Sequence, residues 1–137
     1  MRSFPRIARR AVLVMLFAAA PGCALLPFAA AAGAGAAGAV ALTDHGAQSL
    51  IEAPIGTVRE RTRAVFEEFR IEGMQEEEGG GGSRMELKGT NGPLDVAVEL
   101  ERREPNLTLV IVSASQGEAV WKREYASMVL EAIVKER

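Results

Sequence analysis

The sequence has few of the residue types that most often build catalytic and metal sites. Its 137 residues include one cysteine, one histidine, one tryptophan and one tyrosine. A single cysteine excludes an intramolecular disulfide, so the folded part of the chain has to be held together by packing. A single histidine excludes a metal site built from several imidazole ligands. We therefore expect neither a resident metal ion nor a cofactor.

The scarcity of histidine also bears on catalysis, because histidine is the usual base for a serine nucleophile. His45 follows Asp44 at the end of a long uncharged stretch, and we interpret residues 43–45 as a solvated linker. Several serines of the last third have no other histidine to activate them: Ser113, Ser115 and Ser127. We expect no catalytic residues, and we predict that the chain is not an enzyme.

The first 43 residues contain no acidic residue, and the first one in the chain is Asp44. Four basic residues precede it: Arg2, Arg6, Arg9 and Arg10. Without these four, 12 basic residues remain against 18 acidic ones, a formal net charge of −6. An acidic domain gains nothing from phosphate contacts, so nucleic acid is not an expected partner.

The first residues have the three-part layout of a secretory signal peptide. Residues 1–10 are basic, residues 11–20 are apolar and uncharged, and Pro21-Gly22-Cys23 follows. The apolar part is too short to span the roughly 30 Å hydrocarbon core of a bilayer. We predict a signal peptide over residues 1–22.

The residues at the expected cut, Ala20-Pro21-Gly22-Cys23, resemble a bacterial lipobox. In that motif the cysteine thiol receives a diacylglycerol and the peptide is cut before it. The resemblance implies cleavage after Gly22, lipidation of Cys23 and, because Ala24 follows, sorting to the outer membrane with the domain facing the periplasm. Two alternatives are an uncleaved signal anchor and ordinary cleavage at an Ala-x-Ala site within residues 29–41.

A stretch of alanine and glycine, residues 24–42, follows the cysteine. One interpretation is a flexible tether that, with Cys23, makes up residues 23–45. The other is a membrane helix that associates with a second copy, because Ala34 and Gly38 have small-xxx-small spacing. Both interpretations remain open at the level of the sequence.

The remaining residues, 46–137, have the pattern of a small α+β domain. We expect strands over 46–53, 70–78, 84–89, 94–101 and 107–114, and helices from Pro54 or Thr57 to 69 and over 117–136. Residues 94–101 alternate cleanly between apolar and polar, and 107–114 is apolar enough for a central strand. We predict a two-layer sandwich, with an antiparallel sheet of about five strands and two helices on one face.

Two further features have a functional and a structural interpretation. The run Glu76-Glu77-Glu78, next to a glycine run, is interpreted as a solvated loop rather than a cation site. Trp121 and Tyr125 lie one turn apart on the expected last helix. They form a candidate contact patch for a partner protein or peptidoglycan, or else they pack on the sheet.

The run Gly22-Cys23-Ala24-Leu25-Leu26, the Ala/Gly stretch, the Ala53-Pro54 helix entry and the closing strand and helix resemble an uncharacterised family of small bacterial lipoproteins. The resemblance implies a lipid-anchored α+β domain and assigns no activity. We expect a membrane-anchored envelope lipoprotein that is not catalytic. Its expected role is in binding or assembly, with an envelope protein as its partner. The rivals are a homo-oligomer joined through residues 24–42 and a small envelope enzyme.

Overall fold

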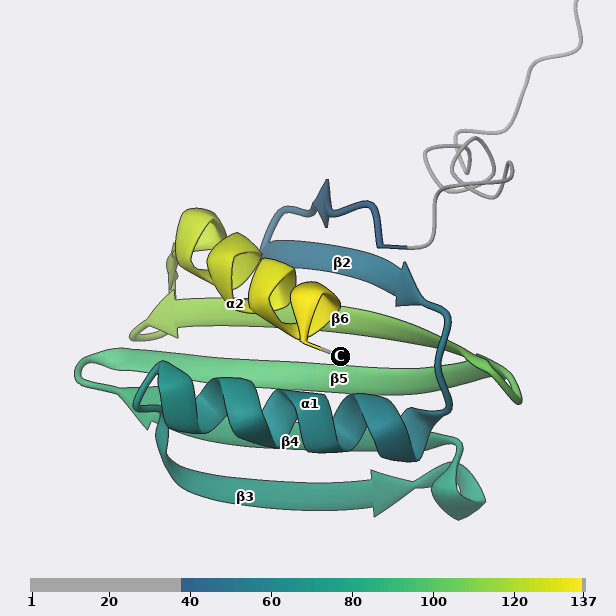
Figure 1. Ribbon diagram of the computed structural model, residues 1–137. Helices are drawn as coiled ribbons and strands as arrows, with labels where there is room; N and C mark the ends of the chain where they lie inside the picture. The colour runs from purple at the N-terminus through teal and green to yellow at the C-terminus, as the bar shows by residue number, and fades with distance from the viewer. Residues whose placement is uncertain (1–37, 137) are drawn as a thin grey trace, which may run out of the picture.

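The computed structural model describes residues 38–136, which form a seven-stranded antiparallel sheet and two α-helices (Figure 1). The elements in chain order are β1 Ala41–Leu42, β2 Gly46–Ile51, α1 Ile55–Glu68, β3 Glu72–Gly79, β4 Arg84–Asn91, β5 Leu94–Glu104, β6 Leu107–Gln116, β7 Val120–Trp121 and α2 Arg123–Lys135. The strand order is β1-β2-β6-β5-β4-β3, and β7 pairs with β6. Gly22, Cys23 and most of residues 24–42 lie outside the described residues.

The mixed α+β class, the antiparallel sheet and the two helices agree with the sequence-based prediction. The sequence predicts about five strands, and the sheet has two more. The additional strands, β1 and β7, have two residues each. Two residues are too few to show an alternating pattern. The apolar segment expected to be a central strand is β6, which lies between β2 and β5.

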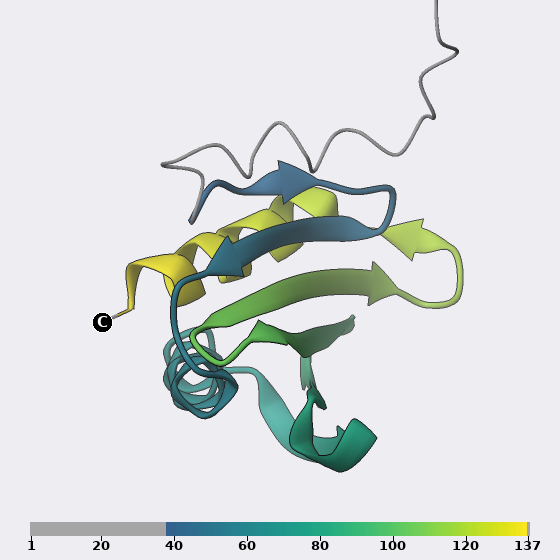
Figure 2. The ribbon, with the colours of Figure 1, turned by 90° about the vertical axis from the view of Figure 1, so that its right-hand side faces the viewer.

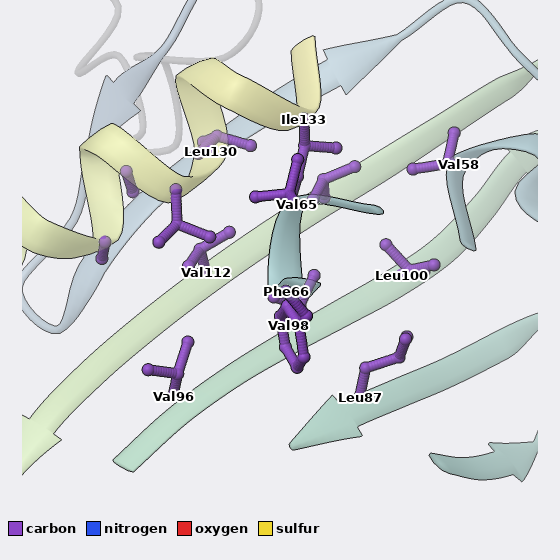
Figure 3. Close-up of a cluster of buried hydrophobic side chains, with 14 of the residues drawn as sticks. Val58, Val65, Phe66, Leu87, Val96, Val98, Leu100, Val112, Leu130 and Ile133 are labelled. Carbon is purple, nitrogen blue, oxygen red and sulfur yellow. The ribbon is translucent and has the colours of Figure 1, made fainter. Parts of the chain in front are cut away.

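Both helices lie on the same face of the sheet, α1 over β4 and β5 and α2 over β2 and β6 (Figures 1 and 2). Alternate residues of the central strands point toward them, as Val98 and Val112 do (Figure 3). Val65 and Phe66 of α1 and Leu130 of α2 meet these strands in one buried cluster. Removing this much apolar surface from water is the main stabilising contribution to the fold.

Helix α1 begins after Pro54, so the earlier of the two expected starts is right. Its end is a Schellman motif, in which the Ile71 N–H donates to the Phe66 carbonyl at 2.8 Å and the Arg70 N–H to the Glu67 carbonyl at 3.1 Å. Arg70 adopts the left-handed conformation, with φ of 54°. Glycine usually fills this position, and here an arginine does. The helix ends within one residue of the expected end at residue 69.

The last helix begins later than predicted, at Arg123 instead of residue 117. Gly117, with φ of 68°, allows the chain to turn after β6. Val120 and Trp121 then pair with Gln116 and Ser115 of β6 as strand β7. The predicted helix over 117–136 is therefore wrong in its first six residues, where a hairpin satisfies the backbone groups instead.

The acidic run lies in the strand expected over residues 70–78 and is exposed, so it is not the loop that was the other interpretation of it. Glu76 to Glu78 belong to β3, an edge strand whose residues are all exposed. A single 3-10 turn, Gly80–Gly82, then joins β3 to β4. Glu76 points to the helix side, where its carboxylate accepts a hydrogen bond from Arg63 Nη2 of α1 at 2.7 Å. This ion pair connects the edge strand to the helix above it.

The ion pair predicts a small pH dependence of stability. Arg63 lowers the pKa of the Glu76 carboxyl below its ordinary value by hydrogen bonding and by its charge. The stabilisation is therefore complete above the ordinary glutamate pKa and is lost as pH falls through the lowered value. We expect Glu76→Gln to lower the free energy of unfolding at pH 7 by about 0.5–1 kcal/mol, since the pair is partly exposed.

The measurement is urea denaturation at pH 7 and pH 3, followed by far-UV circular dichroism. The difference between the wild type and Glu76→Gln is expected to shrink at pH 3. Glu77→Gln is the matched control, because Glu77 lies on the opposite face of β3, across from Glu86. An equal loss of stability in both variants at pH 7 would contradict the role of the ion pair.

Candidate functional site

The face of the sheet opposite the helices, here called the helix-free face, changes character along the strands. Its middle is charged, with Arg84 Nε 3.3 Å from Glu99 Oε1 and Lys88 Nζ 3.0 Å from Glu86 Oε2. One end is apolar, and the other is polar and hollowed. These differences follow from which side chains the register places next to one another.

The hollow at the polar end, here called the sheet hollow, has a volume of about 430 Å³. Five strands contribute side chains to its lining: Gln75 from β3, Lys88 and Thr90 from β4, Asp95 and Ala97 from β5, Ser113 and Ser115 from β6 and Trp121 from β7. Backbone of Gly73, Gly89 and Val96 completes it. Most of these side chains carry hydroxyl, amide or charged groups, and one is aromatic.

The register explains why the sheet is hollowed at this point. Ala97 of β5 lies between Lys88 of β4 and Ser113 of β6 in one cross-strand row. In the neighbouring row, Ser115 lies between Asp95 and Trp121. Small side chains therefore occupy the centre of both rows, while longer ones stand at the sides. The result is a floor of small residues with an indole at one edge.

Trp121 is the aromatic wall of the sheet hollow and is 41% exposed. Its ring packs on His45, with the ring centroids 4.2 Å apart and the planes tilted by 39°. The next residue, Lys122, anchors the hairpin because its N–H donates to the Ala114 carbonyl at 2.8 Å. The indole therefore packs on one imidazole ring, and part of its surface stays open to solvent.

His45 itself is fixed by the turn between β1 and β2. The Gly46 N–H donates to Thr43 Oγ1 at 3.0 Å, and the Thr43 N–H donates to the Gly46 carbonyl at 2.9 Å. The residues interpreted from the sequence as a solvated linker therefore form an ordered hydrogen-bonded turn. Its functional consequence is the support of Trp121.

Tyr125, the second residue of the expected contact patch, lies elsewhere. It belongs to the first turn of α2 and is half-buried on the helix side of the sheet. Its hydroxyl accepts a hydrogen bond from Asn91 Nδ2 at 2.7 Å, and its ring meets Phe69 edge-on at 6.2 Å between centroids. Trp121 and Tyr125 do not share a helix face, so the patch expected from their spacing is not assembled.

The sheet hollow brings together hydroxyl, amide, carboxylate and ammonium groups. His45 packs on Trp121 at the margin of the hollow, and among residues 38–136 no hydrogen bond joins the His45 imidazole to Ser113 or Ser115. The ammonium group of the hollow, Lys88, is paired with Glu86, which raises the pKa of Lys88 and keeps it protonated. Within residues 38–136, no three histidine, cysteine or carboxylate side chains gather in a way that would hold a metal ion.

A second hollow lies at the apolar end of the helix-free face. It has a volume of about 430 Å³ and is lined by Gln48, Leu50, Arg103, Leu107 and Leu109. Leucine side chains dominate its lining, and convergent polar groups are few. It lacks the combination of an aromatic wall with several hydrogen-bonding groups that marks the sheet hollow.

Sequence reasoning identified Trp121 as a contact residue but missed the hollow around it. The available signal was the outward position of Ser113 and Ser115 on an otherwise apolar strand, where they leave space on the sheet surface. Their neighbours across the sheet depend on strand order and register, which local periodicity does not contain.

Neither helix of residues 38–136 has the length and apolar character needed to cross a membrane. Comparison with known proteins finds no relative: no family model matches the chain, and no curated protein matches it.

Proposed function

We propose that the protein is a lipid-anchored, non-catalytic binding protein of the bacterial envelope. In this proposal the signal peptide, residues 1–22, is removed after Gly22, and the new terminal Cys23 carries the lipid. The residues after Cys23 tether a two-layer α+β domain that faces the periplasm from the outer membrane. The domain begins before residue 46, where it was expected to start, because Ala41 and Leu42 form β1 and pair with β2. The domain presents its helix-free face to a partner or ligand.

The observation that carries the binding role is the lining of the sheet hollow. It combines the partly exposed indole of Trp121, which packs on His45, with hydroxyl and amide groups around a floor of small residues. Binding sites commonly unite an apolar or aromatic surface with a few oriented polar groups. A site that is already shaped before the ligand arrives loses less entropy on binding.

The hydrogen bonding around the hollow supports the non-catalytic part of the proposal, because no bond among the described residues joins His45 to Ser113 or Ser115. A nucleophilic mechanism needs a hydroxyl or thiol with a base within hydrogen-bond distance. A general acid–base mechanism needs two groups whose pKa values are pushed apart by their surroundings. The sheet hollow contains one carboxylate, Asp95, and one paired ammonium, Lys88. The arrangement favours recognition.

The anchor is tested by replacing Cys23 with serine in the full chain, expressed in a Gram-negative bacterium. The wild type is expected to incorporate radioactive palmitate and to sediment with the outer membrane. Cys23→Ser is expected to lose the label completely and to accumulate as a longer, uncleaved precursor, because the modified thiol is needed before the cut. Mass spectrometry of the mature N-terminus checks the cleavage position.

Gly22→Ser is the matched control, because it keeps a small residue before the cut and leaves the thiol in place. This variant is expected to be labelled and processed as the wild type is. The lipid anchor is refuted when Cys23→Ser is processed to the wild-type size and still fractionates with the membrane. In that case the alternatives are a signal anchor or ordinary cleavage farther along the chain.

A further inference from the structure

We infer that the sheet hollow binds one neutral sugar ring of an oligosaccharide, with the face of the ring against Trp121 and its hydroxyls on Asp95, Ser113 and Ser115. This inference rests on the proposed binding function, because it names the ligand class of the same hollow. It is argued from four properties of the site: its charge, its backbone pairing, its aromatic wall and its floor.

The charges of the site disfavour an anionic ligand. The ammonium group in the lining belongs to Lys88, and Glu86 already neutralises it at 3.0 Å. Asp95 adds a negative charge, and the chain that follows the basic leader is acidic as a whole. Phosphate and carboxylate ligands are held in proteins by free arginine, lysine or helix N-termini. The hollow offers none of these in an unpaired form.

Backbone pairing disfavours an extended peptide as the ligand. Peptides that add to a sheet bind through unpaired main-chain groups at a strand edge. The floor of the hollow lies on β5 and β6, which are interior strands with neighbours on both sides. Ala97, for example, is paired with Lys88 on one side and Ser113 on the other. The ligand therefore has to be recognised through side chains.

The aromatic wall fits the apolar face of a sugar ring. One side of many pyranoses consists of C–H groups, while the hydroxyls project from the rim. The indole of Trp121 lines the hollow, packs on His45 and is 41% exposed, so part of its aromatic surface is open to a ligand. Tryptophan suits ligands that are apolar on one side and hydrated on the other. The support from His45 reduces the entropy lost when the ring stacks.

The floor and the rim complete the match. Ala97, Ser113 and Ser115 are short side chains, so a ring stacked on Trp121 can approach the sheet surface without displacing them. The two serine hydroxyls both donate and accept hydrogen bonds, and the Asp95 carboxylate accepts them. Gln75 and Thr90 stand farther along the lining and supply further partners. A purely apolar ligand would leave these polar groups unpaired.

The test uses the purified full chain in lauryldimethylamine oxide, a detergent without a sugar headgroup. The probes are tetra-N-acetylchitotetraose, cellotetraose and maltotetraose, titrated by calorimetry and by the emission of Trp121, the one tryptophan of the chain. At least one of them is expected to bind with a dissociation constant below 1 mM and to shift the emission to shorter wavelength. The readout does not depend on the lipid, so its failure is distinguishable from failure of the Cys23 experiment.

Variants assign the binding to the hollow. Ser115→Ala is expected to weaken binding about tenfold, because a hydroxyl of the ligand loses its partner. Trp121→Phe is expected to weaken it about threefold while keeping an aromatic surface, and Trp121→Ala is expected to abolish it. Ser127→Ala is the matched control, since Ser127 lies on α2, away from the hollow, and its affinity is expected to equal that of the wild type.

Several results would overturn the inference. One is that none of the three oligosaccharides binds. Another is that one binds equally well to the wild type, Ser115→Ala and Trp121→Phe, all shown to be folded by circular dichroism. A third is that Trp121 is quenched by doxyl-labelled phospholipids in phosphatidylethanolamine–phosphatidylglycerol vesicles, because the indole would then contact the bilayer instead of a glycan.

Discussion

Replacing Gly46 with alanine is expected to lower the free energy of unfolding by about 3 kcal/mol, more than a usual surface substitution costs. Gly46 begins β2, where it pairs with Ser113 of the central strand β6. A Cβ atom at this position would lie 2.0 Å from the Val112 carbonyl oxygen and 3.0 Å from the Ser113 Cα. Both are backbone atoms, so rotation of a side chain cannot remove the overlap. The two strands have to separate.

The separation is expected to reach the sheet hollow, because Ser113 lines it and His45 precedes Gly46. We therefore expect the emission of Trp121 to move to longer wavelength in the variant as its support loosens. Stability is measured by urea denaturation of the full chain in detergent, with Trp121 emission and far-UV circular dichroism as probes. A common midpoint for the two probes checks that the transition has two states.

Gly56→Ala is the matched control for this prediction. Gly56 lies in the first turn of α1, and a Cβ there meets no atom within 4 Å. Because alanine is the better helix former, this change is expected to raise the free energy of unfolding by about 0.5–1 kcal/mol. If Gly46→Ala were as stable as the wild type, the close approach of β2 to β6 would be wrong.

The interior of the sheet was predictable because its signals are local. Val96, Val98 and Leu100 alternate with polar residues, and all three are buried against the helices. An alternation of period two fixes which side chains share a face, whatever the neighbouring strands are. The apolar run that became β6 likewise indicated a strand covered on both edges. The pattern of apolar residues along β5 and β6 is therefore sufficient to predict both strands.

The beginning of α2 was not predictable by the same reasoning. Trp121 and Tyr125 have helical spacing, so the pattern extends the helix toward Gly117. In the structure Gly117 allows a turn, and the backbone of Val120 and Trp121 finds partners on β6. These hydrogen bonds form because β6 extends past its last residue paired with β2, Ser113, and its edge there is open to another strand. This edge exists only in the assembled sheet. Local propensity is overridden in such places.

The sheet hollow depends still more on assembly. Its side chains come from β3 to β7, and the pairing of β2 with β6 brings the turn that holds His45 beside Trp121. Gly46 and Ser113 are distant in sequence and adjacent in space, and no short-range pattern connects them. One residue of the site, Trp121, was named from the sequence. Its role as a wall of a polar hollow required strand order and register.

The second large expected effect is a loss of stability on replacing Phe66, near the end of α1. Comparing Phe66 with Phe69 also distinguishes the observed core from the one that the sequence predicts. In the sequence, apolar residues and a threonine recur at spacings of four, three and four, which predicts a core-facing stripe of the helix: Val58, Thr62, Val65 and Phe69. The structure buries Phe66 more deeply, at 1% exposure, and leaves Phe69 half-buried as the C-cap residue of the helix. Because the helix ends at a Schellman motif, its last turn tilts Phe69 toward Tyr125 at the margin of the core.

Phe66→Ala is expected to lower the free energy of unfolding by about 3–5 kcal/mol, through lost burial and the cavity left behind. The cavity cannot collapse easily, because Gly89 lies beneath the ring and has no side chain to fill the space. Phe69→Ala, the matched control, is expected to cost about 1–2 kcal/mol, since its ring is partly in water and loses mainly the edge-on contact with Tyr125. Urea denaturation followed by Trp121 emission measures both. A larger loss for Phe69→Ala than for Phe66→Ala would show that the stripe expected from periodicity, and not the packing described here, is the core of the domain.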